Sequence, residues 1–115
     1  MSSTEVLEMK AELSSCWRKP LAVKAEVCAK LLAALAIDPK QADSVRHGFA
    51  LIKARLDVEG RLAYAFERKI EPGSLVRVGG LVGEVTRIRK DGRVQVKLEN
   101  GKSVSSSAFN LTRIW

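Results

Sequence analysis

Two hairpin turns near the end of the chain constrain its fold more than any other feature. Asp91-Gly92 and Asn100-Gly101 are dipeptides that favour two-residue hairpin turns, because both central positions of such a turn need positive φ. Between the two dipeptides, residues 93–98 alternate basic or polar side chains with apolar ones. Because the side chains of a strand point alternately to its two faces, this pattern predicts antiparallel strands with one apolar face.

Further short strands are predicted on both sides of these turns. The strands are expected at residues 74–78, 81–89, 93–98, 102–107 and 111–115, with a single helical turn at 108–110. Val85 and Ile88 both belong to the core, and their spacing of three requires a bulge between them. The other expected core positions are Val76, Val78, Val94, Val96, Leu98, Val104, Leu111 and Ile114. The sequence therefore predicts a five-stranded SH3-like β-barrel over residues 71–115.

The composition changes at Glu71-Pro72-Gly73, and residues 1–70 have a helical pattern instead. Ser2 and Glu5 have the spacing of a capping box, so a first helix is expected from there to about residues 18–19, with Trp17 on its apolar face. Pro20 suits the first turn of a second helix over residues 21–37.

The third helical segment follows Asp38-Pro39, which is a strong start signal. Residues 39–70 are expected to form either one long helix or two, with a break near residues 57–60 as the alternative. Spacings of four and three alternate at Val45, Phe49, Ile52, Leu56, Glu59, Ala63, Phe66 and Ile70. Such a heptad seam favours pairing of helices, either within the chain or in a homodimer. The dimer contacts are predicted at Val45, Phe49, Ile52, Leu56 and Phe66.

The fold class predicted from these patterns is α+β. An N-terminal helical hairpin or three-helix segment, residues 1–70, is followed by the C-terminal barrel, residues 71–115. Neither part is expected to be large enough to be very stable alone, so they should pack together or oligomerise.

Charge indicates an anionic partner, because the chain has 20 basic and 13 acidic residues and a net charge of +7. The excess is densest in residues 71–115, which hold eight basic and four acidic residues. Most of these cations are expected on the outer face of the strands, where they could contact a phosphate backbone. The predicted nucleic-acid-binding residues are Arg77, Arg87, Arg89, Lys90, Arg93, Lys97 and Lys102. Phe109 and Trp115 are the only aromatic residues of the barrel, which disfavours a surface dedicated to stacking bases.

The barrel segment resembles known families through its glycine, valine and turn positions. The positions that look like the SH3-like, Tudor or KOW type of barrel are Pro72-Gly73, Val76, Val78, Gly83, Val85, Ile88, Asp91-Gly92, Val94, Val96, Leu98, Gly101, Val104, Leu111 and Ile114. Within that group, the run Val85-Thr86-Arg87-Ile88-Arg89-Lys90-Asp91-Gly92-Arg93-Val94-Gln95-Val96 is similar to the Tudor-like C-terminal domain of ProQ-type RNA chaperones. The resemblance covers residues 72–115 and implies a fold more than a function; the helical part resembles no such family.

An enzyme is disfavoured by the residues present. The end of the chain, residues 103–114, is similar in shape to the end of plasmid-borne type II dihydrofolate reductases. Ser105 and Ser107 stand where that family has the Gln and Tyr that touch substrate and cofactor, so the activity is not expected. An enzyme would need a pocket formed across a subunit interface. One histidine and two cysteines do not suffice for a zinc site, and no cofactor is expected.

The leading hypothesis is a bacterial, cytoplasmic, non-enzymatic protein that binds DNA or RNA through the basic face of the barrel. It would be homodimeric through its helices and have no membrane segment, since no apolar run approaches about 20 residues. The alternative is a protein-interaction or assembly module, in which the helices, or Phe109 and Trp115, dock a protein partner.

Overall fold

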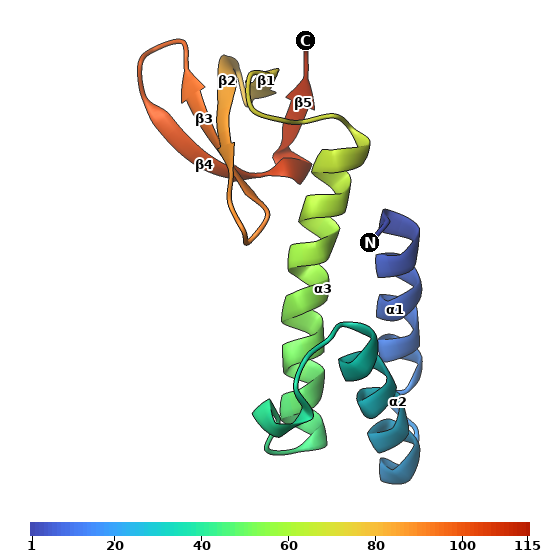
Figure 1. The fold of residues 1–115 in the computed structure, drawn as a ribbon. Coiled ribbons are helices and arrows are strands. Elements are labelled where there is room, and N and C mark those ends of the chain that lie inside the picture. Colours follow the sequence, from blue (N-terminus) through green and yellow to red (C-terminus); the bar gives the residue numbers. More distant parts are fainter. The chain divides into compact units, whose positions relative to one another are not determined.

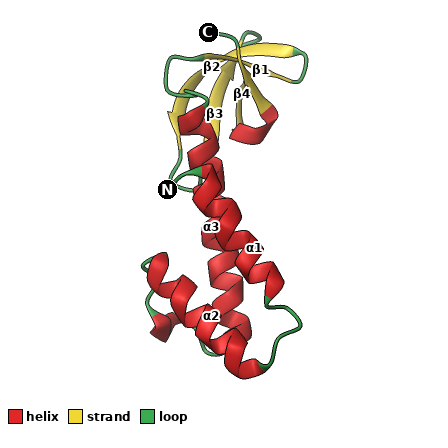
Figure 2. Ribbon diagram, turned by 90° about the vertical axis from the view of Figure 1, so that its right-hand side faces the viewer, coloured by secondary structure: helices red, strands yellow, loops and turns green.

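The computed structural model describes residues 1–115 and has three α-helices followed by a five-stranded antiparallel sheet (Figure 1). This α+β arrangement confirms the fold class at that level. The helices belong to the N-terminal part of the chain and the strands to the C-terminal part, apart from one short helical turn among the strands (Figure 2). The chain divides into two compact units, Met1–Asp57 (unit 1) and Val58–Trp115 (unit 2). The division lies inside the third helix, whereas the composition changes at Glu71.

Helix α1, Ser3–Ser15, begins with the capping box that the sequence predicts. The Ser2 side chain accepts a hydrogen bond from the Glu5 amide, and Glu5 reaches back to the Ser2 amide. The helix is shorter than expected and ends at Ser15, with Cys16 as its C-cap; the Cys16 Sγ donates to the carbonyl of Leu13. Trp17 therefore lies beyond the helix and is 78% exposed, which corrects its predicted place on the apolar face.

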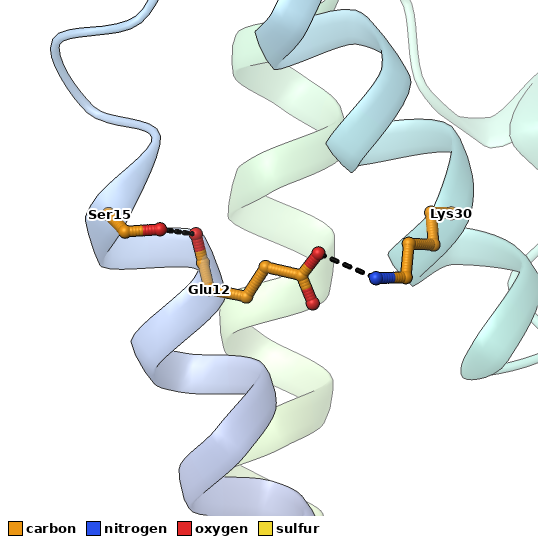
Figure 3. Close-up of polar contacts among 3 residues, drawn as sticks. All are labelled: Glu12, Ser15 and Lys30. Carbon is orange, nitrogen blue, oxygen red and sulfur yellow. Dashed lines mark hydrogen bonds and ion pairs between the residues drawn. The ribbon is translucent and has the colours of Figure 1, made fainter.

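Helix α2, Leu21–Ala34, follows Pro20, which is the N-cap. Its inner face buries Cys28, Leu31 and Leu32. An ion pair joins α2 to α1: Lys30 Nζ lies 2.8 Å from Glu12 Oε1, while Ser15 donates to the backbone carbonyl of Glu12 (Figure 3). Exposed pairs of this kind contribute at most about 1 kcal/mol, so apolar packing accounts for most of the contact between the helices.

The segment after α2 divides differently from either prediction. Asp38 caps only the single 3₁₀ turn η1, Pro39–Gln41, and helix α3 runs from Val45 to Glu67. The side chain of Ser44 accepts a hydrogen bond from the His47 amide at the start of α3. No break occurs at residues 57–60, because a glycine inside a helix costs only about 1 kcal/mol. The helix ends where Lys69 adopts a left-handed conformation, φ 54°, and the Ile70 amide bonds the Ala65 carbonyl.

The core of unit 1 consists of aliphatic side chains from all three helices. Ile52 and Leu56 of α3 are fully enclosed by residues of α1 and α2. Gly48 lets α3 pack closely against Cys28 of α2, because a Cβ at position 48 would overlap the Cys28 sulfur. The buried set is Val6, Cys28, Leu31, Leu32, Leu35, Ile37, Ile52 and Leu56.

The sheet of unit 2 has the strand order β4-β3-β2-β1-β5, with every pair antiparallel. Its strands are β1 (Leu75–Val78), β2 (Leu81–Ile88), β3 (Arg93–Leu98), β4 (Ser103–Ser107) and β5 (Leu111–Arg113), with the 3₁₀ turn η2 (Ala108–Asn110) before β5. The register between β2 and β3 shifts between Val85 and Arg87, which is the predicted bulge. Strands β4 and β5 are the two edges of the sheet, so the closed barrel expected from the sequence is not formed.

The inner face of this sheet carries most of the predicted core. Val76, Val85, Val94 and Val96 are each no more than 1% exposed, and Ala65 of α3 packs with them. Val78, Ile88 and Val104 are partly buried against the same cluster. Ile114 is the exception: it follows β5, and although its amide still bonds the Leu75 carbonyl of β1, the residue is 45% exposed. No helix of either unit is both long and apolar enough to span a bilayer.

Candidate functional site

The alternation along β3 places its basic and polar side chains on the outer face of the sheet. Val94, Val96 and Leu98 are buried, so Arg93, Gln95 and Lys97 point away from the core. Strand pairing extends this face to β2, where Arg87 lies opposite Gln95. All seven predicted basic residues have exposed side chains.

The register brings four of the seven together at one end of the sheet, beside the β2–β3 turn. Arg89 and Arg93 face each other across the hairpin, since the Arg89 amide bonds the Arg93 carbonyl at 2.8 Å. Arg87 precedes this pair on β2, and Lys90 lies in the turn itself. We call this group, Arg87, Arg89, Lys90 and Arg93, the hairpin cluster.

The other three predicted residues lie toward the opposite end of the strands. Arg77 is opposite Val82, and Lys97 is opposite Glu84. Lys102 follows the second hairpin turn. Lys97 is four residues from Arg93, about 13 Å along an extended strand. Glu84 and Glu99, at this end of the sheet, reduce its positive charge further.

The hairpin cluster has an unfavourable feature for stability, because like charges directly opposite each other on a sheet repel. Asp91 is the nearest carboxylate. Its Oδ1 accepts a hydrogen bond from the Arg93 amide at 3.0 Å, and its Oδ2 lies 3.9 Å from the Arg89 guanidinium. The backbone hydrogen bond, and then the surrounding arginines, lower the pKa of Asp91 below its ordinary value. Of the four cluster cations, Arg89 and Arg93 act on this one carboxylate, and the cluster retains a local excess of positive charge.

A fifth cation joins this end of the sheet from α3. Arg61 Nε donates to the backbone carbonyl of Asp91 at 2.9 Å. The contact requires Gly92, since a Cβ at that position would come within 3.2 Å of the Val58 carbonyl and still closer to Arg61. Sequence reasoning missed Arg61, because no local pattern connects a helical arginine with a turn that follows it by 30 residues.

Aromatic residues also gather in unit 2, from elements distant in sequence. The rings of Tyr64, on α3, and Phe109, on η2, meet edge to face with their centroids 4.7 Å apart. The guanidinium carbon of Arg68 lies 4.2 Å from the centroid of the Tyr64 ring. Phe109 remains 53% exposed, so much of its ring is open to solvent.

The predicted dimer contacts do not share one surface. Ile52 and Leu56 lie inside the core of unit 1, whereas Phe66, in unit 2, is 85% exposed. Val45 and Phe49 are partly buried. They line a groove of about 1010 Å³ in unit 1.

That groove combines apolar walls with basic borders. Trp17 and Leu21 are largely exposed beside it, at 78% and 71%. The cations that line it are Lys10, Lys24, Arg46 and Lys53. Lys10 pairs with Asp57, the one acidic residue of the lining, at 3.2 Å. Lys24 lies 5.9 Å from the centroid of the Trp17 ring.

Other reactive side chains form no further constellation. No group of three or more His, Cys, Asp or Glu side chains is arranged to hold a metal ion. His47 Nδ1 accepts a hydrogen bond from the Asp43 amide at 3.1 Å. Cys16 and Cys28 are free, and burial, with Cys16 nearby, raises the pKa of the Cys28 thiol. A raised pKa disfavours the reactive thiolate.

Comparisons of the chain with models of known protein families, with curated proteins and with solved structures give no match.

Proposed function

We propose that this protein is a non-enzymatic nucleic-acid-binding protein whose outer sheet face contacts the phosphate backbone. The proposal rests on one observation: Arg89 and Arg93 meet across the hairpin beside a single carboxylate, that of Asp91, which Arg61 also approaches. Repulsion between these two arginines destabilises the free protein, and an anion bound between them would remove that repulsion.

The fold supports this proposal through its topology. We propose that unit 2 is an incompletely closed SH3-like barrel of the Tudor or KOW type, related to the C-terminal domain of ProQ-type RNA chaperones. The strand order and the 3₁₀ turn before the last strand are consistent with that relationship. Fold alone does not assign function, so the charge arrangement carries the argument.

Fluorescence anisotropy with labelled mixed-sequence DNA and RNA tests the proposal. Because each phosphate contact releases about 0.9 counterion, four contacts predict a loss of affinity on the order of 100-fold between 50 and 200 mM salt. The double variant Arg89→Ala/Arg93→Ala should lower the slope of log affinity against log salt concentration by the equivalent of about two phosphate contacts. It should also weaken binding about 100-fold at 50 mM salt.

The matched control is Arg77→Ala/Lys97→Ala, which removes the same charge from the other end of the strands. We expect its affinity to fall less than about threefold if the hairpin cluster makes the contacts. Equal losses in both double variants would show a diffuse electrostatic attraction instead of a site. No binding at about 50 mM salt, or binding insensitive to salt, would refute the proposal.

The groove of unit 1 favours a second candidate function, a protein-interaction module. Apolar walls bordered by four cations complement an amphipathic helix with acidic flanks, contributed by a partner protein. The exposed Trp17 supplies a readout in a Trp115→Phe background. A synthetic Leu/Glu amphipathic peptide should shift its emission to the blue, and a Leu/Lys peptide of the same pattern should not.

Light scattering in the same experiment addresses self-association. The proposal that the helices form a homodimer predicts a doubled mass, and a Phe49→Glu variant would then be monomeric. A dimer that prevents the Leu/Glu peptide from binding would mean that a second copy of the chain, not an acidic partner, fills the groove.

A further inference from the structure

The aromatic contact in unit 2 specifies the kind of nucleic acid that the hairpin cluster would bind. Phe109 is held by packing on one side and open on the other: its ring meets Tyr64 edge to face, yet 53% of the residue is exposed. Its backbone is fixed as well, because the Phe109 amide donates to the Ser107 side chain at 3.4 Å and η2 is a single tight turn. A ring positioned in this way loses little conformational entropy when another flat group stacks on it.

Strand pairing limits the distance between Phe109 and the hairpin cluster. Ser107 is the register partner of Arg93, and Phe109 follows Ser107 by two residues. A Cα separation of about 5.5 Å across the pair and 3.8 Å per residue keeps Phe109 and Arg93 within roughly 13 Å of each other. An extended arginine side chain covers a substantial part of that distance, so one nucleotide could meet both.

The neighbouring groups suit the two parts of a nucleotide. Arg68 already stacks on Tyr64 at 4.2 Å, and the bond of Arg61 Nε to the Asp91 carbonyl holds this guanidinium beside the turn, where it could meet a phosphate. The β4 side chains opposite Arg93 and Gln95 are Ser107 and Ser105, which offer hydroxyl groups and no apolar surface. Aromatic rings beside arginines are the elements with which proteins bind unpaired bases and their backbone.

We infer that the ligand is single-stranded nucleic acid, with one unpaired base stacked on Phe109 and its flanking phosphates on Arg61, Arg89 and Arg93. This inference rests on the proposed function and makes it more specific. In a duplex the faces of the bases are occupied by their neighbours, so duplex DNA could use the arginines but not Phe109. The inference departs from the expectation drawn from composition, and it does so because a helix residue, Tyr64, packs against Phe109 and adds a second ring that the two barrel aromatics alone do not indicate.

The test compares single-stranded and duplex mixed-sequence DNA of equal length, and single-stranded RNA, on the full chain. The key variant is Phe109→Leu, which keeps apolar volume against Tyr64 but removes the aromatic face. Base stacking contributes about 1–3 kcal/mol per base, so single strands should bind about tenfold more weakly to this variant. Duplex affinity should change less than about twofold, and Phe109→Trp should retain the single-strand affinity.

A spectroscopic readout is independent of any variant. Single-stranded DNA containing 2-aminopurine should lose fluorescence on binding the wild-type protein, because stacking on Phe109 quenches it, and the Leu variant should abolish the loss. Equal affinity for duplex and single strands, with no quenching and no effect of Phe109→Leu, would overturn this inference and leave phosphate binding intact. Failure to bind any of the three nucleic acids would instead refute the proposed function.

Discussion

Unit 1 and unit 2 both carry excess positive charge, but different side chains surround that charge. Residues 1–57 have nine basic and seven acidic residues, and residues 58–115 have eleven and six. In unit 1 four cations border a groove lined by Trp17, Leu21 and Phe49. In unit 2 the cations lie beside serine and glutamine side chains on the outer face of the sheet. In the functions proposed above, net charge favours an anionic partner in both units, and the neighbouring side chains decide between an amphipathic protein segment and a phosphate backbone.

The two cores differ in a corresponding way. Unit 1 fills its interior with large aliphatic side chains from three helices, and its tightly packed glycine, Gly48, meets a side chain. Unit 2 uses valines, and its Gly83 meets a backbone carbonyl as well as side chains. Unit 1 should therefore be most sensitive to the removal of side-chain atoms, and unit 2 to their addition. The predictions below test this contrast.

The largest effect is expected for Ile52→Ala in unit 1. Ile52 is fully buried, and truncating such a side chain leaves a cavity that costs about 3–4 kcal/mol. Val96→Ala in unit 2, also at a fully buried position, removes fewer atoms and should cost about 2 kcal/mol. Urea denaturation followed by circular dichroism measures both. Leu7→Ala, at a position 65% exposed on α1, is the control and should change stability by less than about 0.5 kcal/mol. A larger loss for Val96→Ala than for Ile52→Ala would contradict the contrast.

Adding one methyl group at Gly83 should destabilise unit 2 by about 2 kcal/mol. A Cβ there would overlap Val96 and lie 2.9 Å from the Lys97 carbonyl, which belongs to the β3 ladder and moves little. Gly80→Ala is the matched control, since nothing lies within 4 Å of a Cβ at that position. Urea midpoints of the two variants should therefore differ clearly, and equal midpoints would show that β2 and β3 are not as close as described.

Sequence reasoning predicted unit 2 more completely than unit 1, for physical reasons. The alternation in β3 and the glycine dipeptides are local signals, and they located the strands, the bulge after Val85 and the outward basic residues. The type of turn was wrong, because in these two loops only Gly92 and Gly101 have positive φ and each loop spans three residues instead of two. The end of α1 and the start of α3 depend on packing between helices, so Trp17 and the single turn after Asp38 were placed wrongly. The contacts of Arg61 with the β2–β3 turn and of Tyr64 with η2 could not be predicted, because they join residues 30 or more positions apart.

A smaller effect is expected for the helix cap of unit 1. Ser2→Ala removes the acceptor of the Glu5 amide and one half of the capping box, at a cost of about 1 kcal/mol. Ser14→Ala, inside the same helix, should leave stability unchanged or slightly raised, because alanine has the higher helix propensity. Helicity at 222 nm and the urea midpoint measure both variants. Identical behaviour of the two would mean that the first turn of α1 contributes nothing to unit 1.

The smallest effect is expected for Asp91→Asn, which separates charge from geometry at the β2–β3 turn. Asparagine can still accept the hydrogen bond from the Arg93 amide, so the turn should persist, but the attraction to Arg89 and Arg61 is lost. The pKa of Asp91 is lower in the folded protein than the ordinary 3.8, so its ionised form stabilises the fold above that pH. This contribution is lost as the pH falls through the depressed pKa.

Urea midpoints of wild type and Asp91→Asn should therefore differ modestly at pH 7 and converge as the pH is lowered toward 2. Because Asp91 is exposed, salt near 1 M should also reduce the difference at pH 7. The same variant raises the positive charge beside Arg89 and Arg93, so it should bind nucleic acid more tightly than wild type at 50 mM salt. Unchanged or weaker binding would mean that the Asp91 carboxylate does not repel a phosphate bound at this turn. The cations of unit 2 would then lack the local excess of positive charge that distinguishes them from the cations around the groove of unit 1.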